Sequence, residues 1–210
     1  MKKSFAFLLR LSTFYSYSQV SQNGYTYYQG ATSATQSQLL QKNCLVIDGY
    51  GNKWVGYNTG GLGKFDMNYN WTIFNMTNSS VPDSAIISLA VLNNNTLCVG
   101  TRNGLAIFDG NTSWTIYNTS NSNIAGNYIN SIYTVGNDIW IGTNTGCSKL
   151  TNNTFTNFTS ANGGVINDTV LSFAKTVNAN KIWIGTQRGL TKLENGISTH
   201  YNYQNSALPN

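Results

Sequence analysis

The side chains that could do chemistry are few in this chain of 210 residues, of which 9% are charged. A catalytic or metal site would have to be built from one histidine, three cysteines, one glutamate and six aspartates. These are His200, Cys44, Cys98, Cys147, Glu194, Asp48, Asp66, Asp83, Asp109, Asp138 and Asp168. The cysteines form no CxxC pair, and one histidine is a poor basis for a metal site. No serine stands in a nucleophile elbow, and most of the aspartates fall in expected turns. We therefore expect no catalysis, no metal and no cofactor.

The elements that would position these groups repeat along the chain. The stretch IWIGTNTGCSKL, residues 139–150, recurs three more times with variation. The glycine after its apolar residues lies at Gly56, Gly100, Gly142 and Gly185, in steps of 44, 42 and 43 residues. A fixed period of this size is typical of a repeat architecture.

Each period contains four short runs of β-branched, aromatic and alternating residues, separated by Gly, Asn and Asp turns. No helical periodicity of useful length follows the first twenty residues. Four strands in this length are typical of a β-propeller blade. The sequence predicts an all-β propeller with four four-stranded antiparallel blades, at about residues 43–75, 86–118, 129–159 and 169–202. Within three hairpins, a glycine at positive φ should close the turn, at Gly104, Gly146 and Gly189.

The repeated phrase resembles the two-component regulator propeller family. The pattern of that family begins with an apolar residue, Trp, a second apolar residue, Gly and Thr. Two variable residues follow, and then Gly and Leu. The matching residues are Trp140, Ile141, Gly142, Thr143 and Gly146 in one copy, and Trp183, Ile184, Gly185, Thr186, Gly189 and Leu190 in another. Tyr57 replaces the Thr, Cys98 the Trp and Cys147 the Leu. The resemblance covers residues 44–202 and implies an exported sensor or surface protein.

The conspicuous Trp and Cys residues occupy the repeated frame. All five tryptophans fall on anchor positions, which favours packing between blades over a sugar-binding platform. Cys98 and Cys147 should be small buried hydrophobic residues, although an odd cysteine count also allows a reactive thiol. His200 takes a strand position that is Ile73 and Ile116 in other blades.

The first residues, MKKSFAFLLRLSTFYSYSQ, favour export. A basic start, an apolar stretch and small residues indicate a signal peptide over residues 1–18, with cleavage after Ser18. We expect a periplasmic, cell-surface or secreted protein, with residues 19–210 forming the propeller repeats. No other segment is long enough for a membrane-spanning helix. Without the first 18 residues, nine basic side chains face seven acidic ones, which gives no electrostatic case for nucleic acid.

The variable residues lie at the hairpin tips, where propellers often bind ligands. The candidate ligand-binding residues are Asn58, Arg102, Asn103, Asn144, Gln187 and Arg188. Two arginines at equivalent tips of blades two and four could hold a carboxylate, a sulfate or a sugar acid. The alternative is that they are solvated tips without a ligand.

The beginning of the chain adds one strand. Gly24 to Gln29, GYTYYQ, is spaced like the outer strand of a blade whose other strands are absent. We expect four blades and this orphan strand in an open arc, with missing blades or a partner chain against its ends. The alternative is a complete four-bladed ring.

Three functions remain open. The first is a non-catalytic, ligand-sensing or binding propeller in signal transduction, for which the resemblance suggests glycan recognition. The second is a secreted or surface scaffold that binds a protein. The third is a propeller lyase or hydrolase, which would need a convergent acid–base pair that the sequence does not place.

Overall fold

The computed structural model describes residues 17–22, 25–30, 42–176 and 181–209, and all their regular elements are strands. The chain forms two compact units, residues 1–40 and 41–210, which we describe separately. Within the described residues, no helix is long and apolar enough to cross a membrane.

In the first unit, β1 (Tyr17–Gln22) and β2 (Tyr25–Gly30) form an antiparallel hairpin, with Tyr17 opposite Gly30. The strand expected at Gly24 to Gln29 is therefore present, but it is not an orphan. A lone strand leaves its backbone N–H and C=O groups unpaired, and β1 supplies them with partners. The expected signal-peptide cleavage after Ser18 falls within β1, and residues 1–16 lie outside the described residues.

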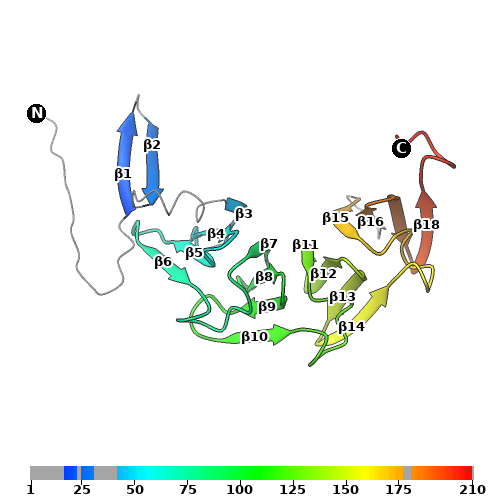
Figure 1. Cartoon of the computed structure of the whole chain (residues 1–210), viewed down its shortest axis with the longest axis horizontal. Helices are drawn as coiled ribbons and strands as arrows, with labels where there is room; N and C mark the ends of the chain where they lie inside the picture. Colours follow the sequence, from blue (N-terminus) through cyan, green and yellow to red (C-terminus); the bar gives the residue numbers. More distant parts are fainter. Residues whose placement is uncertain (1–16, 23–24, 31–41, 177–180, 210) are drawn as a thin grey trace, which may run out of the picture. The chain divides into compact units, whose positions relative to one another are not determined.

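The second unit contains four sheets of four antiparallel strands each, as predicted (Figure 1). We call them blades one to four. Blade one is β3 (Lys42–Ile47), β4 (Lys53–Tyr57), β5 (Leu62–Phe65) and β6 (Trp71–Phe74). Blade two is β7 (Ile86–Val91), β8 (Leu97–Thr101), β9 (Gly104–Phe108) and β10 (Trp114–Tyr117). Blade three is β11 (Ile129–Val135), β12 (Asp138–Thr143), β13 (Gly146–Thr151) and β14 (Thr154–Phe158). Blade four is β15 (Val170–Lys175), β16 (Lys181–Thr186), β17 (Gly189–Glu194) and β18 (Ile197–Tyr201).

Glycines close the hairpins between the second and third strands, as predicted. Gly104, Gly146 and Gly189 have φ of 120°, 129° and 143°, where other residues are strained. A Cβ added to Gly104 would also lie 2.5 Å from the carbonyl oxygen of Tyr117 on the next strand. The glycines therefore let each hairpin turn tightly against the outer strand of its own blade.

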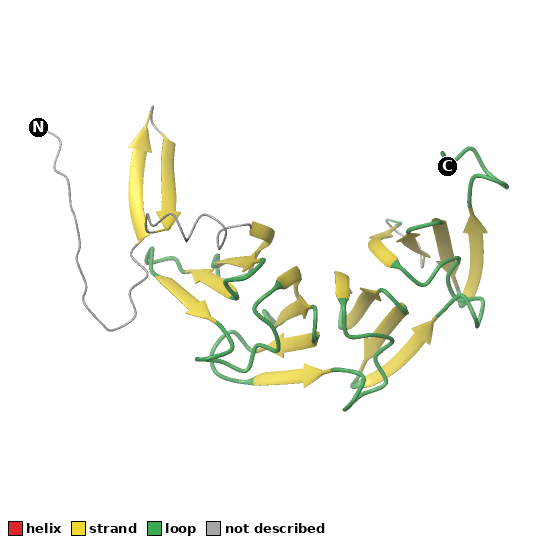
Figure 2. Cartoon of the chain, in the orientation of Figure 1, coloured by secondary structure: helices red, strands yellow, loops and turns green. Residues whose placement is uncertain are grey.

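The blades pack against one another in chain order, with β3 against β7, β7 against β11 and β11 against β15. Figure 2 shows the four sheets side by side in this sequence. Three apolar clusters lie between them, one at each junction. The described strands do not close a ring, since β15 does not pack on β3.

Aromatic rings reach across the junctions. Trp54 of blade one is 1% exposed, and its ring meets Phe108 of blade two edge-on at 5.8 Å. Trp140 lies 6.3 Å from Phe173 of blade four. The expected packing of tryptophans between blades is confirmed at both positions, and each ring contributes a large apolar area to its junction.

The cysteines belong to the same core. Cys98 and Cys147 are fully buried, as predicted for hydrophobic frame positions. Burial raises the pKa of the Cys98 thiol to about 12 and raises the pKa of Cys147 further. Cys44 is half-buried, and burial raises its pKa to about 11. All three thiols are therefore protonated, and hence weakly nucleophilic, at neutral pH.

Candidate functional site: the hairpin tips

The hairpin tips lie beside the linkers that join the blades. The N–H of Gly61 donates to the Ser84 carbonyl at 2.9 Å, and the N–H of Gly104 donates to Asn127 at 2.8 Å. Each tip of blades one to three is thus tied to the segment that enters the following blade. These bonds fix the backbone of the tips and leave their side chains to differ from blade to blade.

Arg102 and Asn58 connect the tips of two blades. The Arg102 Nη2 donates to the Asn58 Oδ1 at 3.0 Å, across the junction between blades one and two. Arg102 is exposed and Asn58 is half-buried. This contact brings together two of the candidate residues, from the tips of blades one and two. A guanidinium has five N–H donors, so one bond to an amide leaves it able to hold an anion.

The second residue of each tip behaves differently. The Asn103 amide donates to the Pro82 carbonyl at 3.5 Å, and the Thr145 hydroxyl donates to the Ala125 carbonyl at 2.7 Å. Both partners lie in the linker that leads into the same blade. Asn103 is therefore used to hold a linker in place, which weakens its case as a ligand-binding residue.

Asn144 is held by a residue that the sequence interpretation missed. Its Oδ1 accepts a hydrogen bond from the Asn130 amide at 2.8 Å, and Asn130 also donates to the Val170 carbonyl at 3.0 Å. Asn130 stands in an apolar strand, where blade two has Ile87. The sequence signal for the role of Asn130 was a polar residue inside an otherwise apolar run.

The two arginines do not occupy equivalent positions. Arg102 directly follows Thr101, whereas Gln187 stands between Thr186 and Arg188. Arg188 therefore corresponds in register to Asn103, and Gln187 corresponds to Arg102. The expected equivalence of the two arginines is therefore wrong by one residue.

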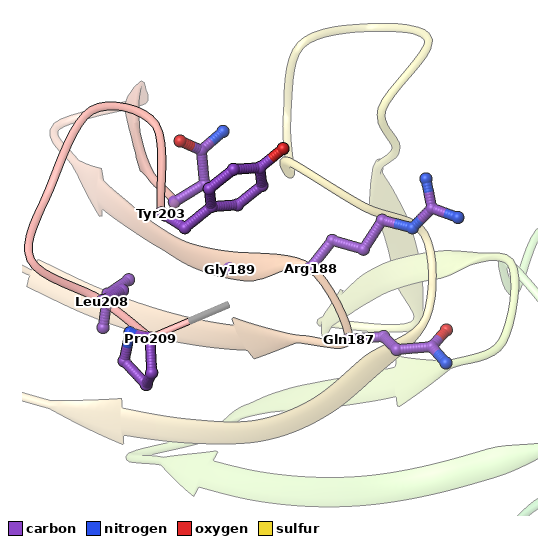
Figure 3. Close-up of a pocket in the computed structure, with 7 residues that line it drawn as sticks. Gln187, Arg188, Gly189, Tyr203, Leu208 and Pro209 are labelled. Atoms are coloured by element: carbon purple, nitrogen blue, oxygen red, sulfur yellow. The ribbon is translucent and has the colours of Figure 1, made fainter.

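A pocket of about 350 Å³ lies next to the tip of blade four. Its lining residues are Gln187, Arg188, Gly189, Asn202, Tyr203, Leu208 and Pro209. Figure 3 shows the Gln187 and Arg188 side chains extending away from Leu208 and Pro209. The long side chains of these two candidates thus point away from the chain segment that forms the other wall.

Asp48 has a structural role at the opposite end of blade one. It is 8% exposed and accepts hydrogen bonds from the Tyr50 and Asn52 N–H groups, both at 2.9 Å, and from Trp54 Nε1 at 2.8 Å. Desolvation raises the pKa of Asp48, but hydrogen bonds from Asn52 and Trp54 outweigh it and hold the pKa below its usual value. The carboxylate therefore orients the Trp54 ring toward the blade junction.

The other acidic groups are also spread over turns and ion pairs. Asp66 and Asp109 accept N–H bonds within Asx turns, as expected. Glu194 pairs with Lys181 and Lys192 at 3.0 and 3.1 Å. In the part of the chain that the structure describes, no three His, Cys, Asp or Glu side chains gather where they could hold a metal ion.

No family model matches the chain, and no curated protein does. Solved structures are similar to it in fold. An extracellular domain assigned to a hybrid two-component system of B. thetaiotaomicron aligns with a TM-score of 0.74 at 19% identity, over 87% of this chain and 26% of that chain. Another from the same organism, assigned to a one-component system, has a TM-score of 0.58 and 21% identity, over 77% and 21%.

Virginiamycin B lyase from Staphylococcus aureus also aligns, with a TM-score of 0.65 and 15% identity, over 87% of this chain and 61% of that chain. Such low identities show the fold alone. This chain spans only 26% of the length of the first structure. The chain is an all-β protein whose four sheets match the blades of β-propellers.

Proposed function

We propose that this chain is part of a non-catalytic, extracellular binding or sensing propeller that takes an anionic ligand at its hairpin tips. An acidic carbohydrate is the ligand class that the chemistry favours. The observation that carries the proposal is the exposed Arg102 guanidinium, held by Asn58 across a blade junction. A planar guanidinium suits a carboxylate or sulfate, because it can donate two parallel hydrogen bonds.

The fold comparisons support the extracellular setting, since two of the similar structures are extracellular domains assigned to a two-component and a one-component system. The neighbouring tips supply neutral donors and acceptors of the kind that sugar hydroxyls use. Asn144 is exposed, and its orientation is fixed by Asn130. A ligand lying along the tips of blades one to three would therefore meet one cation and several amides.

Arg102→Ala tests this site directly. The chain would be screened against acidic and neutral glycans, and the dissociation constant of the best acidic ligand measured by calorimetry. Loss of a charge-assisted hydrogen bond costs about 1.5–3 kcal/mol, so we expect binding to weaken about 10- to 100-fold. Binding should also weaken with added salt, because the tip is exposed.

Lys175→Ala is the matched control, since Lys175 is an exposed cation at the other end of blade four and should leave affinity unchanged. Equal affinities of the Arg102→Ala variant and the original chain would contradict the proposed site. Mass spectrometry of the ligand after incubation checks the non-catalytic assignment, because a covalent change in the ligand would favour a lyase or hydrolase. Binding of proteins but of no glycan would favour the scaffold function.

A further inference from the structure

The three junctions between blades share one steric feature. A glycine on the second strand of each blade faces a branched aliphatic residue that begins the inner strand of the following blade. A Cβ added to Gly56 would lie 2.7 Å from Ile86 Cγ2, and one added to Gly142 would lie 2.8 Å from Val170 Cγ1. Gly100 and Ile129 repeat the arrangement at 2.7 Å. Each glycine thus leaves room for the branched side chain that begins the inner strand of the next blade.

The junctions also share a hydrogen bond. The tip glycine donates its N–H to the carbonyl of the residue two positions before the branched aliphatic residue. The pairs are Gly61 with Ser84, Gly104 with Asn127 and Gly146 with Asp168, at 2.9, 2.8 and 2.8 Å. The described residues offer Gly189 of blade four no equivalent carbonyl.

Among the described residues, nothing covers the same face of blade four. Five of its residues are half-buried where their counterparts in blades two and three are buried: Trp183, Gly185, Thr186, Gly189 and Leu190. For a Cβ added to Gly185, the three nearest heavy atoms all belong to Ser172 of its own blade, and none to a following blade. Blade four therefore has the same second-strand glycine and tip glycine that receive the following blade at the other junctions.

The segment after blade four already has the geometry of a linker. The Asn202 N–H donates to Asn205 Oδ1 at 2.8 Å, as the Asn118 N–H does to Asn121 at 2.9 Å. Asn205 donates to the His200 carbonyl at 3.0 Å, as Asn121 does to Ile116. Its apolar residue, Leu208, is 38% exposed, whereas the three equivalent residues are nearly buried, with Val81 at 3%, Ile124 at 4% and Val165 at 1%.

We propose that this face of blade four is a docking site for a further blade of the same repeat, which enters with its inner strand. The carbonyl of its lead-in segment accepts the Gly189 N–H, and an Ile or Val two residues later sits over Gly185. The pocket of about 350 Å³ beside Gly189, Leu208 and Pro209 is the space that this lead-in segment fills. This face of blade four does not include Arg102 and Asn58, which carry the proposed ligand site.

Blade one of a second copy is a poor occupant for this site. Lys42 stands opposite Tyr57 in its sheet, the register position that Ile86 holds opposite Thr101 and Val170 opposite Thr186. Seating a lysine over Gly185 would bring a charged group to an apolar junction, which is costly without a partner. The site therefore selects a blade that begins with a branched aliphatic residue.

A chain extended after Asn210 by a copy of residues 84–125 tests the proposal. In this copy, the Ser84 carbonyl is placed to accept the Gly189 N–H, and the Ile86 side chain is placed over Gly185. Amide hydrogen exchange would be measured at Gly189, with Gly146 as the internal reference. We expect exchange at Gly189 to slow by at least about tenfold on extension, toward the rate of Gly146. The matched control carries lysine in place of the appended Ile86 and should leave Gly189 exchanging quickly.

A second extension, a copy of residues 127–168, covers the case in which the first copy does not fold. Protection of Gly189 in either extended chain supports the docking site, and fast exchange in both overturns it. Equal protection in the lysine control would overturn the proposed side-chain preference. Sedimentation of the unextended chain should show a monomer. A dimer with a protected Gly189 would make a second copy the occupant and would also overturn the proposal.

Discussion

At the scale of single residues, small offsets decide what each side chain does. Arg102 and Arg188 stand on hairpin tips with the same frame, yet one residue of offset gives them different positions. Arg102 reaches Asn58 of the neighbouring blade, whereas the position of Arg188 is used in blade two by Asn103 to hold a linker. The proposed ligand site therefore centres on Arg102, and the Arg102→Ala variant is its decisive test.

Asp48 gives the fold a dependence on pH. Its folded-state pKa is lowered, so protonation costs more in the folded than in the unfolded chain. The resulting stability is complete above the unfolded pKa of about 3.9 and is lost as the pH falls through the folded value. We expect the midpoint of urea unfolding to fall between pH 4 and pH 2, and to fall less in Asp48→Asn. An identical decline in both proteins would show that Asp48 is not responsible.

At the scale of elements, the blade junction carries most of the stabilising burial. Trp54 is buried between blades one and two, whereas Trp183 occupies the same frame position on the uncovered face of blade four. Trp54→Ala should lower the free energy of unfolding by about 3–5 kcal/mol, the usual cost of truncating a buried aromatic residue. Trp183→Ala should cost less than half as much. Urea denaturation followed by circular dichroism measures both, and equal losses would mean that the face of blade four is covered.

Which elements form could be predicted from the sequence, and how they meet could be predicted only in part. The repeat period and the tip glycines indicated four sheets of four strands, because spacing and turn chemistry are local properties. The partner of β2 was missed, because β1 overlaps the end of the expected signal peptide. Asn130 was missed as well, since its role depends on Asn144 and on the Val170 carbonyl of the next blade. Contacts between blades depend on orientations that a repeat pattern does not record.

At the scale of the whole second unit, stability should be graded along the row of blades. Blades two and three are covered on both faces, while blades one and four each have one face without a neighbour among the described residues. Leu45 and Ile47, on the open face of blade one, are 63% and 58% exposed. In a repeat array, stability is approximately a sum over blades and their junctions.

Hydrogen exchange should therefore be slowest in β8 and β12 and faster in β4 and β16, which hold the same place in the outer blades. In the chain extended after Asn210, exchange in β16 should slow toward the rates of β8 and β12, because blade four gains a neighbour. Exchange in β4 should not change. Uniform protection of all four strands would show that the unit opens in one cooperative step. That result would contradict the graded model.

The unlike ends of the row have a consequence for solubility. A repeat array whose two ends matched would add to itself head to tail, and an association that does not close grows into a fibre. In such a contact, Lys42 is the residue whose register position would lie over Gly185 of the other copy. A lysine at this register position should disfavour head-to-tail addition of a second copy, because it would bring a charged group to an apolar junction. We expect Lys42→Ile to weaken this barrier.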